Sequence, residues 1–401
     1  MSVEPATVAL MAFGVLMLLG FGTFGVTSLL EGEHRAAGVA LELSIALAIP
    51  FFLATLLPLP LRWALVGLIT VAALLFFLLP VGGVERDREE PGMRIDERDI
   101  MFARARLEPG TPNYEAYYAL RPEKKASDDT TRSLPGILSA ETSEAEPLVF
   151  GATEATFVYI ERLRDAVNGP VAPEQLAFQA RSGTDYIKGL ARYWGARDVG
   201  ITELKPDHVY SHIGRGKGTY GAPITLDHRY AIAFTVEMDY DLIGSSPDAP
   251  TVMESTRQYV ESAKIAVQVG YFIRSLGYPA RAHIDGNYRV IAPLVARDAG
   301  LGENGRMGLL MTPELGPRVR LRVVTTDLPL THDQRNTDDV SVLDFCRICQ
   351  KCAENCPPNA IPRGDREEID GTLRWRIDSD SCFRYWSIVG TDCGRCMAVC
   401  P

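Results

Sequence analysis

Long runs of apolar side chains fill the first part of the chain, up to Val81. Residues Ala6 to Leu30 contain no charged side chain, and this length suffices for a helix that crosses a bilayer. A second run, Ala36 to Leu57, carries Glu42 as its one charge. A third run, Trp63 to Val81, follows prolines that would interrupt one continuous helix. The pattern predicts three membrane spans, with two spans and a re-entrant hairpin as the alternative.

The arginines around these runs indicate which way the chain would face. Cytoplasmic loops are enriched in Lys and Arg, so the side with more of them is expected inside the cell. Arg62 lies on one side of the predicted spans, and the other side has Arg35, Arg86, Arg88, Arg94 and Arg98. The counts predict an outside N-terminus and a cytoplasmic body. Glu42 is expected near a helix end, where it reaches water; a proton-transfer or quinone-site role is the alternative.

The segment from 84 to 147 is rich in Arg, Glu, Asp and Pro and has little apolar periodicity, so we expect a linker or an extended arm. Ser127-Asp128-Asp129 is a candidate helix cap within it. From Gly151 to about Asp333, helical and strand patterns alternate, which favours one α/β domain. The pattern predicts helices at 153–167, 174–194, 252–276 and 290–299, and strands at Tyr230–Glu237, Leu309–Met311 and Arg318–Thr325.

The helix expected at 252–276 carries a stripe of mostly small residues. Its members, spaced for one helix face, are Ser255, Tyr259, Ser262, Ala263, Ala266 and Gly270. Such a face either packs tightly on a sheet, which this pattern alone favours, or lets a flat ligand approach. Two G-x-G-x-x-G matches begin at Gly216 and Gly300. Neither follows a strand and opens a helix, so we reject a dinucleotide site at both.

Charge and cysteine content narrow the chemistry. The 401-residue chain has a formal net charge of −10 and no basic patch, so nucleic-acid binding is not expected. All eight cysteines lie near the C-terminus, in two runs with similar spacing. The runs are Cys346-x2-Cys349-x2-Cys352-x3-Cys356-Pro357 and Cys382-x10-Cys393-x2-Cys396-x3-Cys400-Pro401.

The first run has the spacing of bacterial two-cluster ferredoxins, in which the fourth cysteine binds the other cluster. The spacing therefore predicts two [4Fe–4S] clusters. One would be held by Cys346, Cys349, Cys352 and Cys400, and the other by Cys382, Cys393, Cys396 and Cys356. Zinc is disfavoured because neither run contains a histidine, and a disulfide framework is typical of short secreted chains. The second run ends the sequence at Pro401, and a fragment and a complete motif both stay open.

Further segments resemble the corrinoid- and iron–sulfur-dependent reductive dehalogenases. They extend from about Arg121 to Pro401 and precede the cysteine runs in the family's order. The segments are Arg121–Lys124, Ser133–Gly136, Tyr271–Tyr278, Ala299–Gly308, Leu315–Arg320 and Thr325–Leu330. Together they are far more specific than any one alone. The ten-residue gap of the second cysteine run is similar to a known variant of the family pattern.

The resemblance implies a fold and a reaction site. The fold would be a nitroreductase-like α/β core that holds cobalamin in its base-off form, with no protein side chain as the lower cobalt ligand. Tyr259 would donate a proton, Asn287 would be a polar amide beside it, and Arg320 would be the basic residue, with Arg318 as its rival. The residues expected against the corrin are Gly300, Gly302, Gly305 and Arg306.

The chain departs from respiratory members of that family at its N-terminus. Those members carry a twin-arginine export signal and dock to a separate small protein of three membrane helices. Here no twin-arginine pair precedes the first apolar run, and the N-terminal segment resembles that anchor fused to the enzyme. We therefore predict a multi-pass protein of the cytoplasmic membrane with its catalytic domain in the cytoplasm. Its expected parts are a transmembrane anchor at 1–83, a linker arm at 84–147, a cobalamin-binding catalytic domain at 148–335 and a ferredoxin-like module at 336–401.

The predicted function is reductive dehalogenation, in which hydrogen replaces a carbon-bound halogen of a small organohalide. The expected partners are the lipid bilayer and a low-potential ferredoxin, a flavodoxin or a quinol-linked reductase as electron donor. Two alternatives stay open. One is a membrane-bound ferredoxin-type electron carrier without substrate chemistry of its own. The other resembles epoxyqueuosine reductase, which shares the corrinoid core and clusters but is soluble, uses an aspartate as acid and carries a tail for tRNA.

Overall fold

The computed structural model of the chain describes residues 4–31, 34–79, 93–335, 341–369 and 372–401. The chain forms two compact units, one up to residue 84 and one from residue 85 onward. The predicted boundary at 83/84, together with Val81, Arg86 and Arg88, lies outside the described residues, as does the predicted start of the ferredoxin-like module at 336.

The N-terminal unit consists of α1 (Pro5–Leu30), α2 (His34–Ala54) and α3 (Leu59–Leu78). Each helix is long and apolar enough to cross a membrane. The Ser44 hydroxyl on α2 donates to the carbonyl of Leu18 on α1 at 2.9 Å. A Cβ at Gly25 would lie 2.8 Å from the Leu41 side chain, so glycine permits close packing of α1 on α2. The expectation of three apolar helices is therefore confirmed, whereas their passage through a bilayer stays a prediction.

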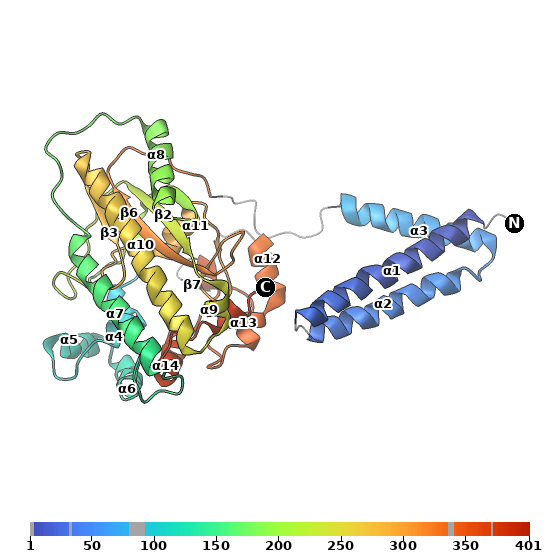
Figure 1. The fold of residues 1–401 in the computed structure, drawn as a ribbon, viewed down its shortest axis with the longest axis horizontal. Coiled ribbons are helices and arrows are strands. Elements are labelled where there is room, and N and C mark those ends of the chain that lie inside the picture. Colours follow the sequence, from blue (N-terminus) through green and yellow to red (C-terminus); the bar gives the residue numbers. More distant parts are fainter. Residues whose placement is uncertain (1–3, 32–33, 80–92, 336–340, 370–371) are drawn as a thin grey trace. The chain divides into compact units, whose positions relative to one another are not determined.

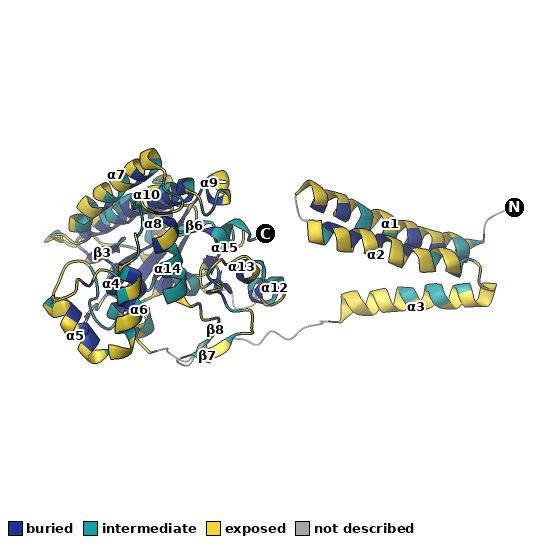
Figure 2. Cartoon of the chain, turned by 90° about the horizontal axis from the view of Figure 1, so that it is seen from below, coloured by how far each residue is buried: buried dark blue, intermediate teal, exposed yellow. Residues whose placement is uncertain are grey.

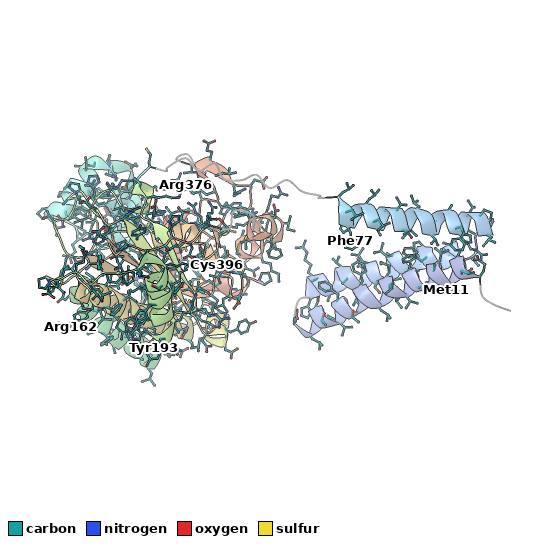
Figure 3. The ribbon with its side chains drawn as sticks, turned by 90° about the horizontal axis from the view of Figure 1, so that it is seen from above. Met11, Phe77, Arg162, Tyr193, Arg376 and Cys396 are labelled. Carbon is teal, nitrogen blue, oxygen red and sulfur yellow. The ribbon has the colours of Figure 1, made fainter. Side chains whose placement is uncertain are left out.

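The outer surface of this unit is apolar. Most of its side chains are exposed, and those of Met11 and Phe77 project outward from α1 and α3 (Figures 2 and 3).

Arg62, at the start of α3, donates to the Thr7 hydroxyl near the start of α1 at 2.7 Å. Glu42 lies near the middle of α2 and is exposed, so the expectation that it lies near a helix end is wrong. The helix begins at His34, earlier than the apolar run indicates, which moves Glu42 inward.

The second unit begins with helices where a linker arm was expected. They are η1 (Glu97–Asp99), α4 (Met101–Arg104), α5 (Pro112–Leu120) and α6 (Pro122–Arg132). Ser127, Asp128 and Asp129 lie inside α6, so the predicted helix cap is wrong. The buried Arg104 donates to Asp128 at 2.6 Å and also pairs with Asp380 of α14 (Ser379–Val389). The polar residues that suggested a linker thus form buried ion pairs, which apolar periodicity cannot reveal.

A four-stranded antiparallel sheet forms the centre of this unit, in the order β1 (Val199–Glu203), β2 (Tyr230–Glu237), β6 (Val319–Thr326) and β3 (Ala280–His283). Side chains of β2 alternate between two cores because successive strand residues face opposite sides. Ile232 and Phe234 pack with α10 (Ala249–Ser275), whereas Ala231 and Ala233 pack with α11 (Ala292–Asp298). Helices thus cover both faces of the sheet, and α7 (Pro147–Leu163) packs on α10 (Figure 1).

The predicted elements of this unit are confirmed, with shifts of a few residues at most ends. The prediction for β2 matches its bounds, and the helix expected at 252–276 is α10. On α10, Ala263 and Ala266 belong to the same core as the sheet, so tight packing explains that half of the small-residue stripe. The other elements are η2 (Arg164–Ala166), α8 (Ala180–Tyr193), η3 (Pro206–His208), α9 (Tyr240–Gly244), β4 (Glu303–Asn304), β5 (Leu310–Met311), α12 (Ser341–Cys349), α13 (Lys351–Glu354), β7 (Glu367–Ile369), β8 (Thr372–Arg374) and α15 (Arg395–Ala398).

Replacing Asp128 by Asn should destabilise the second unit, because the Arg104 charge would remain buried without that carboxylate. Loss of one partner from a buried ion pair costs about 3–5 kcal/mol. The expected result is a lower midpoint of chemical denaturation for the full chain in detergent under anaerobic conditions. Asp165→Asn, which removes a surface pair with Lys217, is the matched control and should leave the midpoint unchanged. An unchanged midpoint in Asp128→Asn would contradict the assigned role of Arg104.

Candidate active site

Tyr259 and Arg320, predicted as proton donor and basic residue, lie in contact. Tyr259 comes from α10, and Arg320 from β6 on the sheet beneath it. The Arg320 guanidinium lies 4.4 Å from the centre of the Tyr259 ring, and its Nη1 donates to the Tyr259 hydroxyl at 3.4 Å. Its Nη2 donates to the buried Ser255 hydroxyl at 2.6 Å, one turn earlier on α10. At this end of the small-residue stripe, Ser255 and Tyr259 therefore contact an arginine of the sheet.

A third partner of Arg320 comes from the second cysteine run. Nη2 of Arg320 also donates to Oδ2 of Asp392 at 3.0 Å, and Asp392 directly precedes Cys393. Only 20% of the Arg320 side chain and 12% of the Asp392 side chain are exposed. Burial opposes the charge of Arg320, but the neighbouring Tyr259 and Asp392 outweigh it and raise the arginine's pKa. The guanidinium thus stays charged between an aromatic hydroxyl and a carboxylate.

Tyr288 and Arg322 extend the site. Arg322 is buried on β6, with its guanidinium 4.9 Å from the centre of the Tyr259 ring and 5.6 Å from that of Tyr288. Arg215 approaches the other ring at 5.9 Å from the centre of Tyr288. Burial raises the pKa of the Tyr288 hydroxyl well above its usual range, although the Arg322 charge opposes this shift. The site therefore has two aromatic hydroxyls among arginines.

Asn287, predicted as the polar amide of the site, has other partners. Its Oδ1 accepts from Arg281 at 2.8 Å, and its Nδ2 donates to the carbonyl of Arg164 at 3.2 Å. These bonds fasten the turn after β3 to the end of α7 and η2. Its neighbour Tyr288 is the residue whose ring lies beside Arg322, since adjacent residues of an extended segment point to opposite sides. The structure thus favours Tyr288 over Asn287 as a neighbour of Tyr259.

The glycine loop expected against the corrin packs against protein atoms. A Cβ at Gly302 would lie 2.1 Å from the carbonyl oxygen of Met311, and one at Gly300 would lie 3.0 Å from that of Gln334. At Gly305 a Cβ would lie 2.7 Å from the Met311 side chain and 3.3 Å from Cys346 Sγ. Close approach within the chain accounts for the lack of a side chain at all three glycines, and their contact with a corrin ring stays a prediction.

Arg306 also has a different setting from the one expected. It is buried, and its guanidinium donates to the carbonyls of Cys346 at 2.9 Å, Arg347 at 3.1 Å, Pro362 at 2.8 Å and Gly364 at 2.6 Å. It also stacks on Trp375, 4.8 Å from the ring centre. Arg306 therefore fastens the first cysteine run to the loop that follows it, and its contact with a corrinoid stays a prediction.

The pKa shifts of the cysteines indicate which thiols lie near one another, and the assignment of all eight to two clusters stays a prediction. Burial and then repulsion from Cys346, Cys352 and Cys349 raise the pKa of the Cys400 thiol to about 12. Burial and then repulsion from Cys393 and Cys356 raise the pKa of the Cys382 thiol to about 12. The last cysteine of each run, Cys356 or Cys400, thus lies near cysteines of the other run, as the ferredoxin spacing predicts.

The cysteines supply the donors that iron–sulfur clusters use. A [4Fe–4S] cluster is held by four thiolates, and the chain has eight cysteines. The number of clusters that they hold stays a prediction.

The surroundings of Tyr259 also fit a bound polar cofactor. Nε of Arg320, Nε of Arg322 and Oδ1 of Asp392 are buried and have no hydrogen-bond partner in the described part of the chain. Buried polar groups are normally paired, so these three suit a site completed by a polar molecule. A cavity of about 940 Å³ also opens beside Cys346 and Cys400, but neither Tyr259 nor Arg320 lines it. The cavity therefore lies apart from the contact of Tyr259 with Arg320.

Sequence reasoning missed three residues of the site, Arg322, Tyr288 and Asp392. Arg322 could have been found, because it shares a strand face with Arg320 two residues away. Asp392 could have been noticed as a charged residue directly before a cluster cysteine. Tyr288 had no signal of its own, since only the turn after β3 sends it rather than Asn287 toward Arg322.

Comparison with known proteins finds a matching domain family and similar enzymes. The 4Fe-4S dicluster domain family matches residues 345–401. The tetrachloroethene reductive dehalogenase of Desulfitobacterium hafniense is 37% identical over 180 residues, which are 42% of this chain and 32% of that protein. The tetrachloroethene reductive dehalogenase of Sulfurospirillum multivorans is 32% identical over 252 residues, 54% of this chain and 50% of that protein.

A solved structure of a reductive dehalogenase is also similar to this chain. A reductive dehalogenase described as suggesting a mechanism for B12-dependent dehalogenation has a TM-score of 0.61 and 28% identity, and the match covers 78% of this chain and 42% of that one. The chain spans between about a third and a half of the length of these relatives. The resemblance predicted from the sequence motifs is confirmed: this chain is a relative of the reductive dehalogenases, with a 4Fe-4S domain at its C-terminal end.

Proposed function

We propose that this chain is a membrane-anchored reductive dehalogenase that replaces a carbon-bound halogen by hydrogen with the help of cobalamin and two [4Fe–4S] clusters. The observation that carries the proposal is the contact of Tyr259 with Arg320, which in turn bonds to a residue of the second cysteine run. Arg320 thus contacts both the proposed proton donor, Tyr259, and Asp392, which directly precedes a proposed cluster ligand. The relatives named as dehalogenases support the same reaction class.

The reaction takes two electrons and one proton and releases a halide ion. When bound, the corrinoid supplies cleavage of the carbon–halogen bond, and the clusters supply electrons one at a time. Tyr259 holds the proton and donates it to the carbon that has lost the halogen. Arg320 stabilises the resulting tyrosinate through its contact with the hydroxyl, and its positive charge also favours the departing halide. Arg320, Arg322 and Tyr288 would hold polar groups of the cofactor.

The N-terminal unit supports attachment to a membrane with the second unit in the cytoplasm. Because Arg62 bonds to Thr7, the start of α3 lies beside the start of α1, and the three helices alternate in direction. Arg35 at the start of α2 is then on the same side as the end of α3, from which the chain continues to Arg94 and Arg98. The positive-inside rule places that side in the cytoplasm. A low-potential ferredoxin or flavodoxin is the electron donor that suits this orientation.

Halide release tests the function directly. Anaerobically purified full-length protein in detergent, loaded with cobalamin and given a chemical reductant, should release halide from members of a panel of halogenated phenols, alkenes and alkanes. Halide release should depend on the corrinoid. Material that holds its iron and sulfide but binds no corrinoid would support the electron-carrier alternative, and bound corrinoid without any halide release would contradict dehalogenation.

Tyr259→Phe should lower the turnover number by about 10²- to 10⁴-fold, because the hydroxyl that donates the proton is lost while the ring and its contact with Arg320 remain. The measurement is halide release under saturating substrate with cobalamin bound. Tyr271→Phe is the matched control, since Tyr271 lies on the same helix with 69% of its surface exposed, and this variant should keep full activity. Full activity in Tyr259→Phe would remove Tyr259 from the mechanism.

Cys356→Ser should remove the cluster of the second set and leave the other, although Cys356 belongs to the first run in sequence. The expected result is a loss of about four of eight irons, with the signal of one reduced cluster left in the electron paramagnetic resonance spectrum. Cys400→Ser should give the reciprocal result. If Cys356→Ser disturbed the cluster of Cys346, Cys349 and Cys352 instead, the crossed assignment would be wrong.

A further inference from the structure

The loop that carries Cys393 and Cys396 is fixed against the loop before α10. The buried Thr391 hydroxyl donates to the carbonyl of Pro247 at 2.7 Å and accepts from the Cys393 N–H at 3.3 Å. Arg395 donates to the carbonyl of Ser246 at 3.4 Å. A Cβ at Gly394 would lie 2.5 Å from the Ser246 hydroxyl, so glycine allows the two loops to touch. The carboxylate of Asp392 is therefore held in one place.

Asp392 reaches from this loop to the proton-donor site. Its Oδ2 accepts from Arg320 at 3.0 Å, and the same Arg320 nitrogen donates to Ser255 at 2.6 Å. These two bonds hold the guanidinium between α10 and the loop that carries Asp392 and Cys393. There it also lies over the Tyr259 ring. No other carboxylate forms an ion pair with Arg320 within the part of the chain that the structure describes. Asp392 alone thus balances the charge of the arginine.

The same carboxylate is adjacent to a proposed cluster ligand. Asp392 directly precedes Cys393 in the chain, and the bonds of Thr391 fix the loop that carries both residues. A negative charge at this position disfavours added negative charge on a cluster held by that cysteine. The charge of Asp392 is therefore positioned to act on both the electron carrier and the proton donor.

We propose that Asp392 is a positioning residue that holds Arg320 against Tyr259 and, through its charge, links the state of the cluster at Cys382, Cys393, Cys396 and Cys356 to the proton-donor site. This proposal rests on the proposed function for its kinetic part only. With a cluster bound by these cysteines, its reduction would add negative charge on the side of Asp392, and the charge of Arg320 would compensate both. After the electron has passed on, the charge of Arg320 would be available to stabilise the tyrosinate of Tyr259.

The test compares Asp392→Asn, Asp392→Glu and Ser255→Ala in the iron–sulfur-loaded full chain. Asp392→Asn should raise the midpoint potential of the second-set cluster and leave that of the first set unchanged, followed by paramagnetic resonance during a redox titration, because a negative charge beside one cluster is removed. It should also lower kcat by about 10- to 100-fold with KM unchanged, since a charge-assisted hydrogen bond that does not touch the substrate is lost. Asp392→Glu should bring both the midpoint potential and kcat most of the way back to the values of the unmodified protein.

Ser255→Ala separates the effect of the position of Arg320 from the effect of the charge of Asp392. It removes the other bond of the same Arg320 nitrogen, so kcat should fall, but the potential of the second-set cluster should stay as in the unmodified protein. Unchanged potentials in Asp392→Asn would overturn the proposal, as would a loss of iron that Asp392→Glu does not restore. If the unmodified protein released no halide, the proposed function would fail, while the potential shift would still decide the role of Asp392.

Discussion

The Arg320 guanidinium needs partners from three parts of the chain, and this requirement constrains the rest of the second unit. Ser255 and Tyr259 are in place because α10 packs on the sheet through Ala263 and Ala266. Arg320 is in place because β6 pairs with β2 along its length. Asp392 is in place because its loop is bonded to the residues before α10. A shift in any one of these contacts would separate the arginine from the hydroxyl or from the carboxylate.

Buried arginines recur through this unit although the chain as a whole is acidic, with a net charge of −10. Arg104 joins α4 to α6 and α14 through two carboxylates. Arg306 joins the first cysteine run to the next loop through four carbonyls. A guanidinium has five N–H donors in a rigid planar fork, whereas a lysine ammonium has three, so arginine is better suited to bonding groups from several segments at once. Arginine is therefore the residue that ties the cysteine-rich part to the rest.

Sequence patterns predicted the apolar helices, the central strands, α10 and the 4Fe-4S domain, because each depends on local periodicity or spacing. Helices α4–α6 escaped prediction, since their buried side combines a cluster of tyrosines with the ion pairs of Asp128 and its partners and so lacks a clear apolar period. Resemblance to a family pointed to Tyr259 and Arg320, which the structure brings together. It also pointed to Asn287 and Arg306, whose bonds go elsewhere, because a motif does not tell which residue of a turn faces the site.

Cobalamin uptake tests the central claim most directly, because the account assigns the buried, unpaired groups of Arg320 and Arg322 to a corrinoid beside Tyr259. Anaerobic full-length protein with intact iron–sulfur centres should bind cobalamin with a one-to-one stoichiometry and give the paramagnetic resonance spectrum of its base-off form. Arg322→Met should weaken this binding, because one of the unpaired donors is removed, while Asp165→Asn should not. Protein that keeps its iron and sulfide but takes up no cobalamin would contradict the account.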